Sequence, residues 1–133
     1  MMKVFGDSAF FVAGLSQRDQ HHEDALRLAI EYSGQVFTSY WVLLEVANYF
    51  SASLNRATAG QLVDTVLSDL AVECAEPDAT TFKAGLQLYR ERPDKNWSLT
   101  DCISFRLMRE RGITEALSSD HHFEQAGFHI LMK

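Results

Sequence analysis

Four carboxylates in this chain stand apart from other charges, each within a run of apolar or small residues. Asp7 is the only charged residue between Lys3 and Arg18. The other three lie in the segments YWVLLEVANYF, NWSLTDCISF and ALSSDHHF, and they are Glu45, Asp101 and Asp120. A carboxylate among buried residues costs several kcal/mol unless it is paired, protonated or bound to a metal ion. Four of them in one small protein therefore suggest a shared acidic site that a hard cation neutralises.

Most of these carboxylates also have an ordinary structural explanation. Asp7 suits a turn at the end of a strand, and Asp120 could cap the short helix that HFEQAG predicts. In the segment Ser98-Leu-Thr-Asp101, Asp101 completes a capping box at a helix start. Glu45 is harder to explain in this way, because its neighbours three and four positions away carry no cation. We therefore favour a functional role for Glu45.

Composition limits the class of protein. The chain has 133 residues, of which 47% are hydrophobic, which suits one compact domain spanning residues 1–133. Its formal net charge of −6 argues against a general polyanion-binding protein, although a bound divalent cation reverses the local sign of an acidic site. The two cysteines, Cys74 and Cys102, lie in separate apolar contexts and predict neither a disulfide framework nor a zinc ribbon.

The start of the chain makes a poor signal peptide, because charges interrupt its apolar residues. No apolar stretch reaches the roughly 20 residues of a membrane helix without polar interruption. We therefore expect a soluble, cytoplasmic protein that has no membrane partner.

Short apolar runs alternate with helical patterns along the chain. Strands are expected at residues 3–7, 35–39, 70–77, 113–119 and 128–132, and helices at 20–32, 39–50, 58–70, 80–92 and 98–111. This alternation predicts a parallel sheet with helices on both faces. Such sheets bind ligands beyond the carboxyl ends of their strands. Asp7 and Asp120 fall at strand ends, Asp101 lies in the first turn of a helix and Glu45 about two turns into the helix after the second strand, so the four could meet at one edge.

Other polar residues are expected to cap helices. Ser8 is placed to cap a helical turn after the first strand, and Asp19 to cap the helix that follows it. Thr58 and Gln61 match a capping box at the start of a later helix. Gly112 is expected to end the helix that begins at the Ser98 capping box.

The set and order of these residues resemble the PIN-domain ribonucleases, in particular the VapC-like toxins of bacterial toxin–antitoxin pairs. The matching segments are VFGDSAFFVA, TSYWVLLEVAN, NWSLTDCISFRLM and LSSDHHFEQAGF, in that order along the chain. Each motif alone is common, but the four together span essentially the whole chain at family-like intervals. The resemblance implies an α/β fold, a three-layer α/β/α sandwich with a central, mostly parallel sheet. It also implies a hydrolase that cuts RNA as an Mg²⁺- or Mn²⁺-dependent endoribonuclease.

The resemblance also assigns roles to single residues. It places Asp7, Glu45, Asp101 and Asp120 at the catalytic and metal-binding positions, and Ser8 at the hydroxyl position beside the first of them. We expect Asp7 and Asp101 to be the main metal ligands, since Mg²⁺ prefers oxygen ligands. Glu45 and Asp120 are expected to bind the metal through water or to position the nucleophile, because metal-bound water is easier to deprotonate.

Cations and histidines add less specific signals. Arg92 and Lys95 precede Asp101 and are expected to bind the substrate by steering its phosphates, although solvated helix faces explain them equally well. Several relatives carry a further acidic residue just after the last aspartate, where this chain has His121 and His122. The histidines lack the i, i+4 spacing of a helical zinc pair, so surface or partner-contact roles are expected for them.

Other functions fit the residues less well. The third strand ends in AEP, without the acceptor aspartate of a phosphorylated receiver domain, and Ala9 occupies the second position of the D-x-D motif of haloacid-type phosphatases. Two alternatives remain open. One is a catalytically inactive acidic domain that only binds a partner, and the other is a PIN nuclease of RNA processing without a toxin role.

The helix expected at 39–50 is apolar nearly all round, which is typical of a helix buried on more than one side. In a domain this small, part of that surface is expected to meet another chain. VapC-like proteins usually form homodimers and bind an antitoxin peptide over the acidic groove. The resemblance therefore implies a homodimer and a cognate antitoxin protein as partners, beside the RNA substrate.

Overall fold

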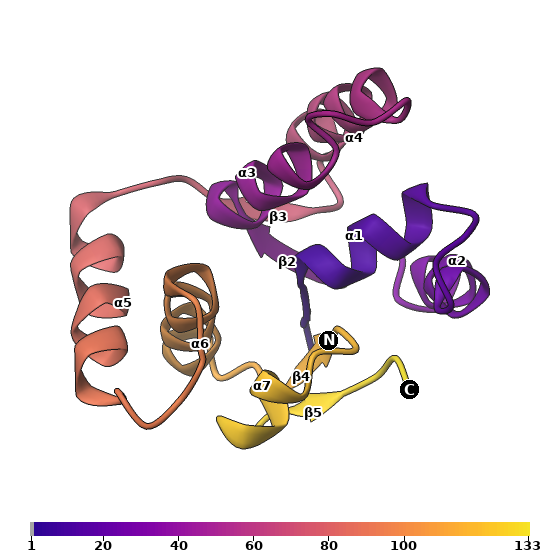
Figure 1. The fold of residues 1–133 in the computed structure, drawn as a ribbon. Helices are drawn as coiled ribbons and strands as arrows, with labels where there is room; N and C mark the ends of the chain where they lie inside the picture. The colour runs from indigo at the N-terminus through magenta and orange to yellow at the C-terminus, as the bar shows by residue number, and fades with distance from the viewer. Residues whose placement is uncertain (1) are drawn as a thin grey trace.

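The computed structural model describes residues 2–133, which form a sheet of five parallel strands surrounded by helices (Figure 1). The strands are β1 (Val4–Gly6), β2 (Val36–Ser39), β3 (Glu73–Ala75), β4 (Glu115–Leu117) and β5 (His129–Ile130). The helices are α1 (Ser8–Leu15), α2 (His22–Glu31), α3 (Tyr40–Tyr49), α4 (Arg56–Ser68), α5 (Ala79–Glu91), α6 (Leu99–Arg111) and α7 (His121–Gln125). None of the helices in residues 2–133 has the length and apolarity needed to span a membrane.

The strands lie in the order β3-β2-β1-β4-β5, so the first strand of the chain is the central one. β1 pairs in parallel with β2 on one side and with β4 on the other. Helices α5 and α6 lie on one face of the sheet, and α1 and α2 lie on the other (Figure 1). This confirms the three-layer arrangement and the parallel sheet. After β1 the chain continues to β2 on one side of the sheet, and after β4 it continues to β5 on the other side. Sheets of this kind bind ligands in the crevice at the carboxyl ends of the two strands where the direction changes.

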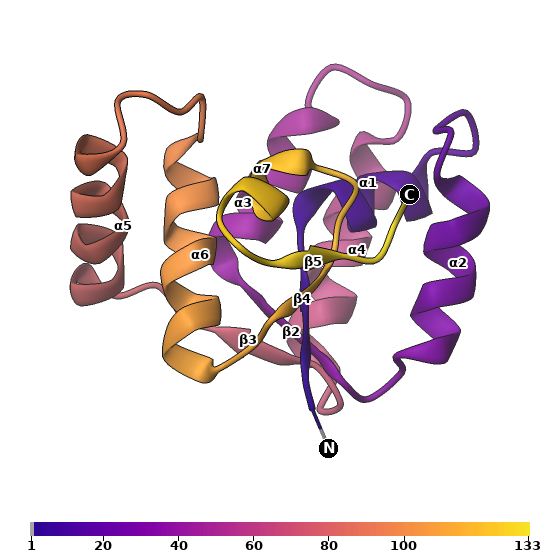
Figure 2. The ribbon, with the colours of Figure 1, turned by 90° about the horizontal axis from the view of Figure 1, so that it is seen from below.

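Segments far apart in the sequence meet at this carboxyl edge. Figure 2 shows the N-terminal end of α1, helix α7 and the loop from α5 to α6 lying towards the upper edge of the view. The chain enters β1 from the opposite, lower edge. Residues from these three segments can therefore line one site.

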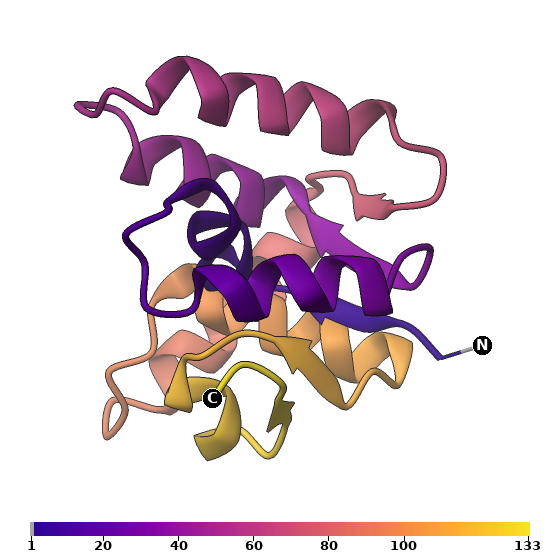
Figure 3. The same cartoon turned by 90° about the vertical axis from the view of Figure 1, so that its right-hand side faces the viewer.

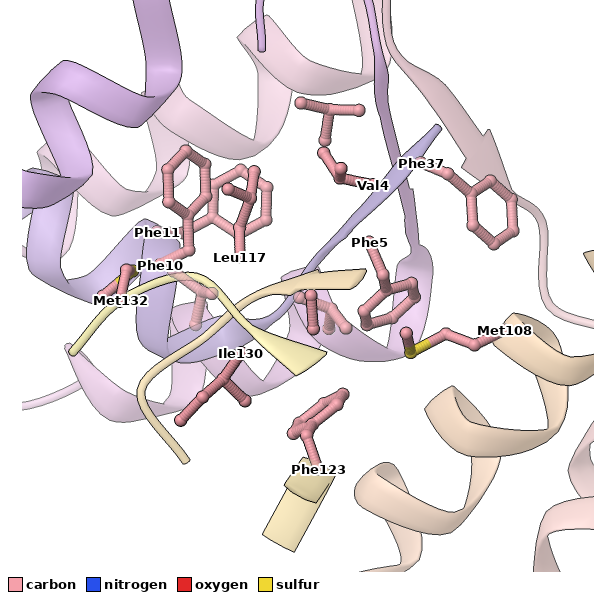
Figure 4. Close-up of a cluster of buried hydrophobic side chains, with 14 of the residues drawn as sticks. Val4, Phe5, Phe10, Phe11, Phe37, Met108, Leu117, Phe123, Ile130 and Met132 are labelled. Carbon is pink, nitrogen blue, oxygen red and sulfur yellow. The ribbon is translucent and has the colours of Figure 1, made fainter. Parts of the chain in front are cut away.

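The core lies between the sheet and the helices and is rich in aromatic side chains (Figure 4). Phe5, Phe37 and Phe123 are fully buried, and the ring of Phe5 lies 6.0 Å from that of Phe37 and 6.2 Å from that of Phe123. Burial of one such side chain stabilises the fold by roughly 1.5–3 kcal/mol. Strands β1 and β2 are buried on both faces, which explains their uninterrupted apolar or small residues. This core fixes the carboxyl ends of β1 and β4, where the acidic residues begin.

Helices α5 and α6 pack closely because a glycine lies between them. A Cβ atom added to Gly85 would lie 3.0 Å from Ile103 Cα, inside normal contact distance. The backbones can approach this closely only when position 85 lacks a side chain. The close packing fixes the loop between the two helices relative to α6, which carries Asp101.

Two predicted helix starts are wrong. Asp7, and not Ser8, is the N-cap of α1, because Ser8 already has helical geometry and α1 is a full eight-residue helix rather than a turn. Thr58 lies inside α4, which begins at Arg56, so no capping box forms there. The helix extends further towards the N-terminus because the carbonyl group of Asn55 accepts a hydrogen bond from the Ala59 N–H.

Other caps are as expected or displaced by a few residues. Ser98 and Asp101 form the predicted capping box of α6, and Gly112 ends that helix with a φ of 67°. The N-cap of α2 is His21 rather than Asp19. The Asp19 carboxylate accepts a hydrogen bond of 2.8 Å from the His21 N–H, so it stabilises the turn that leads into the helix.

Helices α3 and α4 lie side by side at the top of Figure 3. Within this chain Val42, Leu43 and Val46 of α3 are buried. Leu44 and Tyr49 are exposed by 60% and 67%, so part of the apolar surface of the helix is left uncovered, and its contact with another chain stays a prediction. The apolar sequence of α3 therefore does not translate into complete burial within this chain.

Candidate active site

A cleft of about 410 Å³ lies at the carboxyl edge of the sheet and contains all four carboxylates singled out in the sequence. We call it the acidic cleft. It is lined by Asp7, Ser8, Ala9, Val12, Asp19, Glu45, Tyr49, Asn96, Ser98, Asp101, Asp120 and His122. No lysine or arginine is among these lining residues, so the carboxylates have no cationic side chain beside them in the cleft. Four separate segments of the chain thus converge on one acidic surface.

Asp7 is the most deeply buried of the four carboxylates, with 3% of its surface exposed. It follows β1 directly, and its N–H donates a hydrogen bond to the carbonyl group of Leu117 in β4. The Ser118 hydroxyl group donates a hydrogen bond of 2.7 Å to Asp7 Oδ2. The pKa of Asp7 is raised to about 7, mainly by burial; the charges of Asp101 and Glu45 contribute to the increase, and the hydrogen bond from Ser118 opposes it. A nearby cation would relieve the cost of ionising this carboxyl group.

Asp101 both caps helix α6 and lines the acidic cleft. Its Oδ2 atom accepts a hydrogen bond of 3.1 Å from the Ser98 N–H, and its own N–H donates to the Ser98 hydroxyl group at 3.0 Å. The same carboxylate lines the acidic cleft. Burial raises its pKa, the hydrogen bond from the Ser98 N–H opposes this, and the charge of Asp120 adds to the increase. The capping box therefore holds a cleft carboxylate in a fixed orientation.

Asp120 follows β4 and caps helix α7, as the sequence predicted. Its Oδ1 atom accepts a hydrogen bond of 2.9 Å from the His122 N–H, and its own N–H donates to the Ser118 hydroxyl group at 3.0 Å. Ser118 is fully buried, and its hydroxyl group contacts the carboxylate of Asp7 and the backbone N–H of Asp120. The sequence analysis did not identify this residue, because only the pairing of β1 with β4 brings it beside Asp7.

Glu45 reaches the cleft from helix α3 and is held there by a residue of helix α1. The Ser8 hydroxyl group donates a hydrogen bond to Glu45 Oε1. Ser8 therefore supports the carboxylate that the sequence could least explain as structural. Tyr49, one helical turn after Glu45, also lines the cleft.

His122 is the cleft residue that the sequence analysis placed wrongly. Its Nδ1 atom lies 3.2 Å from Asp101 Oδ2 and 3.4 Å from Asp120 Oδ1. The expected surface role fits His121, whose side chain is 71% exposed, but not His122, whose side chain is 21% exposed. The available signal was the spacing from Asp120: a residue two positions after an N-cap aspartate lies in the first helical turn, near the cap.

The donor atoms of the cleft fit a divalent cation. Ligand atoms of Asp101, Asp120 and His122 all lie within 4.8 Å of one another. Carboxylate oxygens suit Mg²⁺ and Mn²⁺, and an imidazole nitrogen suits transition metals such as Mn²⁺ better than Mg²⁺. The buried carboxylate of Asp7, with its raised pKa, is a group that a cation would keep ionised.

Arg92 and Lys95 do not line the acidic cleft. Both line a neighbouring hollow of about 810 Å³ on the loop between α5 and α6. The guanidinium group of Arg92 is bound to the Asp94 carboxylate through Nε at 3.0 Å and Nη2 at 2.9 Å. The structure thus brings the four carboxylates and Ser8 together and places the two predicted phosphate-steering residues beside them.

Comparison with known proteins agrees with this arrangement. The sequence model of the PIN domain family matches residues 4–129. The 23S rRNA-specific endonuclease VapC20 of Mycobacterium tuberculosis (strain ATCC 25618 / H37Rv) is 27% identical over 125 residues, which are 94% of this chain and 95% of that protein.

Solved structures share the fold. The crystal structure of Mycobacterium tuberculosis VapC20, described as a sarcin-ricin loop cleaving toxin, superposes with a TM-score of 0.90 at 24% identity, covering 98% of this chain and 100% of that one. The structure of DNA-bound VapBC from Salmonella typhimurium superposes with a TM-score of 0.68 at 16% identity and covers 98% of both chains.

Proposed function

Because the chain belongs to the PIN domain family, we propose that it is a metal-dependent endoribonuclease that hydrolyses RNA phosphodiester bonds. The single observation that carries the proposal is the convergence of Asp7, Glu45, Asp101 and Asp120 in one cleft whose lining contains no lysine or arginine. An RNA phosphate could not approach four carboxylates without a cation between them. The chemistry of the donor atoms favours Mg²⁺ or Mn²⁺ as that cation.

The proposed mechanism assigns each carboxylate a role. Asp7 and Asp101 are the main metal ligands, because they are the most buried carboxylates of the cleft and are oriented by Ser118 and Ser98. A divalent cation bound there would lower the pKa of a coordinated water molecule and stabilise negative charge developing on the phosphate.

Glu45, Asp120 and Ser8 are assigned to the activation of the attacking water. Glu45 and Asp120 are placed to accept its proton or to hold it, since both carboxylates face the cleft and are less buried. The Ser8 hydroxyl group keeps Glu45 in one orientation by donating to Oε1. The second oxygen of Glu45 is then available for water or substrate.

We propose RNA as the substrate class and a toxin–antitoxin pair as the context. VapC20 is named as a 23S rRNA-specific endonuclease, so 23S rRNA is the first RNA to test with this chain. VapBC pairs of Salmonella typhimurium and Rickettsia felis share the fold, which supports an antitoxin as the protein partner.

We also propose a homodimer. Besides Tyr49, which lines the acidic cleft, three large apolar side chains of α3 and α4 are exposed: Tyr40 by 37%, Leu44 by 60% and Leu67 by 42%. Neighbouring helices that both expose apolar residues form a surface that a second copy could cover.

Cleavage of RNA by the purified protein tests the enzyme assignment. Single-stranded RNA and a 23S rRNA fragment should be cut in Mg²⁺ or Mn²⁺ and left intact in EDTA. Asp101→Asn should abolish cutting but keep the fold, because an asparagine side-chain oxygen can still accept the Ser98 hydrogen bond. Asp64→Asn, on the exposed side of α4, is the matched control and should cut RNA normally. Full activity of Asp101→Asn in clean preparations would refute the proposal.

A further inference from the structure

The hollow beside the acidic cleft has features that the proposed cleavage reaction does not use. We call it the basic hollow. It is lined by Tyr89, Arg90, Arg92, Pro93, Lys95, Asn96, Trp97, Ser98 and Leu99. Asn96 and Ser98 also line the acidic cleft, so the two depressions are continuous. A chain bound in one can pass directly into the other.

The hollow exists because α5 ends abruptly. Pro93 cannot continue a helix and restricts the residue before it, so α5 ends at Glu91 and Arg92 leaves the helical conformation. A hydrogen bond of 3.1 Å from the Lys95 N–H to the Arg92 carbonyl group closes the turn. The turn projects the side chains of residues 89–96 around one depression, next to the start of α6.

The charge of the hollow is opposite to that of the protein as a whole. The three charged residues in its lining, Arg90, Arg92 and Lys95, are all cations, while the chain carries a formal net charge of −6. Within residues 2–133, Arg90 and Lys95 take part in no ion pair. Two cations without an ion pair, beside a cleft proposed to bind phosphodiesters, favour a polyanion as the occupant.

Arg92 and Trp97 form the wall of the hollow rather than its binding groups. The Arg92 guanidinium group is engaged by Asp94 and lies 5.1 Å from the centre of the Trp97 ring. Trp97 is only 6% exposed, and its indole N–H donates a hydrogen bond of 3.0 Å to Gln125. The groups left for a ligand are therefore Arg90, Lys95 and the one exposed aromatic ring.

That ring belongs to Tyr89, which is 49% exposed at the end of α5. An exposed aromatic ring beside cations is the arrangement that binds single-stranded nucleic acid, because bases stack on the ring while phosphates contact the cations. Duplex RNA keeps its bases stacked on one another and cannot use such a ring. An acidic peptide would satisfy the cations but would leave Tyr89 without a specific contact.

We infer that the basic hollow binds a single-stranded stretch of RNA adjoining the cleaved bond, with a base stacked on Tyr89 and phosphates contacted by Arg90 and Lys95. The inference rests on the proposed ribonuclease function, since it assigns the hollow to the same substrate. It makes Tyr89 a substrate-binding residue and demands an unpaired segment next to the scissile phosphate. Arg92 then acts by shaping the hollow.

Binding of RNA without cleavage tests this. We would measure fluorescence anisotropy of a labelled single-stranded RNA with Asp101→Asn protein in Mg²⁺, where the RNA should stay intact. Adding Tyr89→Ala should weaken binding about 5- to 100-fold, the range expected for loss of one base–aromatic stack. Adding Lys95→Gln should reduce the slope of log affinity against log salt by about 0.7, the value for one single-strand phosphate. A duplex of the same sequence should bind more weakly and not respond to Tyr89→Ala.

Matched controls come from the same helix. Phe82→Ala removes a ring of α5 that is 41% exposed, and Lys83→Gln removes a cation of α5, and neither residue lines the hollow. Both should leave RNA binding unchanged. If Tyr89→Ala and Lys95→Gln bind RNA as the Asp101→Asn parent does, the inference is refuted. It is also refuted if these two changes weaken binding of an acidic peptide but not of RNA.

Failure of the inference and failure of the proposed function are distinguishable. If protein with native Asp101 cuts RNA but RNA binding does not depend on Tyr89, the RNA-binding role of the basic hollow is refuted and the nuclease assignment stands. If single-stranded RNA binds in a Tyr89-dependent way but is not cut in Mg²⁺ or Mn²⁺, the RNA-binding role of the basic hollow stands and the nuclease assignment is refuted.

Discussion

Ser118 Oγ donates a hydrogen bond of 2.7 Å to Asp7 Oδ2, which joins the ends of β4 and β1 across 111 positions of sequence. The same oxygen accepts the N–H of Asp120 at 3.0 Å. One buried hydroxyl group therefore sets the positions of two carboxylates that come from opposite ends of the chain. The arrangement of the acidic cleft depends on it as much as on the carboxylates themselves.

Ser118→Ala should lower RNA cleavage by roughly 10- to 100-fold, the usual effect of losing a residue that orients metal ligands. It should also destabilise the fold by about 1–3 kcal/mol, because Asp7 Oδ2 and the Asp120 N–H lose a buried partner. Cleavage assays and denaturant unfolding measure the two effects. Ser119→Ala is the control, since Ser119 makes none of the side-chain hydrogen bonds found in residues 2–133. Unchanged activity in Ser118→Ala would show that the orientation of Asp7 and Asp120 does not depend on the Ser118 hydroxyl group.

Stability of the metal-free protein should fall as pH rises from about 4 to about 7. The pKa of Asp7 is raised from 3.8 to about 7, so between these values the native state holds a proton that the unfolded state has lost. Raising the pH through this window therefore favours unfolding, and the effect is complete above pH 7. A shift of this size corresponds to at most roughly 4 kcal/mol.

Asp7→Asn should remove that dependence, because its amide does not titrate. Its melting temperature in EDTA should exceed that of the native chain at pH 8 and match it more closely at pH 5. The variant Asp64→Asn should keep the dependence of the native chain. Parallel melting curves for the native chain and Asp7→Asn across this pH range would contradict the assignment.

Millimolar Mg²⁺ should raise the melting temperature of the native chain. Binding to the folded state alone stabilises it by RT ln(1 + [L]/Kd), about 1.4 kcal/mol at a tenfold excess over Kd. Asp101→Asn should lose most of this stabilisation, since it removes a buried anionic ligand. Differential scanning calorimetry with and without EDTA measures the shift. A melting temperature that Mg²⁺ does not change would show that the cleft is not a cation site.

His122 should make the cleft favour Mn²⁺. An imidazole nitrogen binds Mn²⁺ better than Mg²⁺, so His122→Asn should weaken Mn²⁺ binding more than Mg²⁺ binding. Isothermal titration calorimetry gives both affinities. His129→Asn, on the exposed side of β5, is the control. Equal losses for the two metals would mean that His122 only positions its neighbours.

Leu44→Arg should convert a dimer to a monomer that keeps its fold, because Leu44 is 60% exposed within one chain. Phe50→Ala should instead destabilise the fold by about 3–5 kcal/mol, because Phe50 is 3% exposed and packs in the core. Light scattering at micromolar concentrations separates the two effects. A native chain that is monomeric throughout this range would refute the dimer.

The sequence predicted the sheet well because strands buried on both faces read as apolar runs, as in VFG and VFTS. It also identified the four cleft carboxylates, since single charges stand out in such runs. It could not identify Ser118 or place His122, because their contacts depend on strand pairing and on the cap of α7. A serine in the segment LSSD looks like any loop serine until β4 lies beside β1.

Helix boundaries were less predictable than helix existence. Thr58 and Gln61 match a capping box by residue type, yet α4 starts earlier because the Asn55 carbonyl group accepts the Ala59 N–H. Tyr49 of α3 carries no polar signal that would mark it as a cleft residue in the sequence. Its position one turn after Glu45 places it at the acidic cleft.

The placement of β1 between β2 and β4 has a consequence for synthesis of the protein. The chain emerges from the ribosome N-terminus first, so Asp7 and Glu45 appear early, while β4, Ser118 and Asp120 appear last. Until then β1 lacks its second neighbour, and Asp7 lacks the hydroxyl group that orients it. A nascent chain therefore carries no complete acidic cleft. The cleft becomes complete only when the segment that carries Ser118 and Asp120 has left the ribosome and folded beside β1.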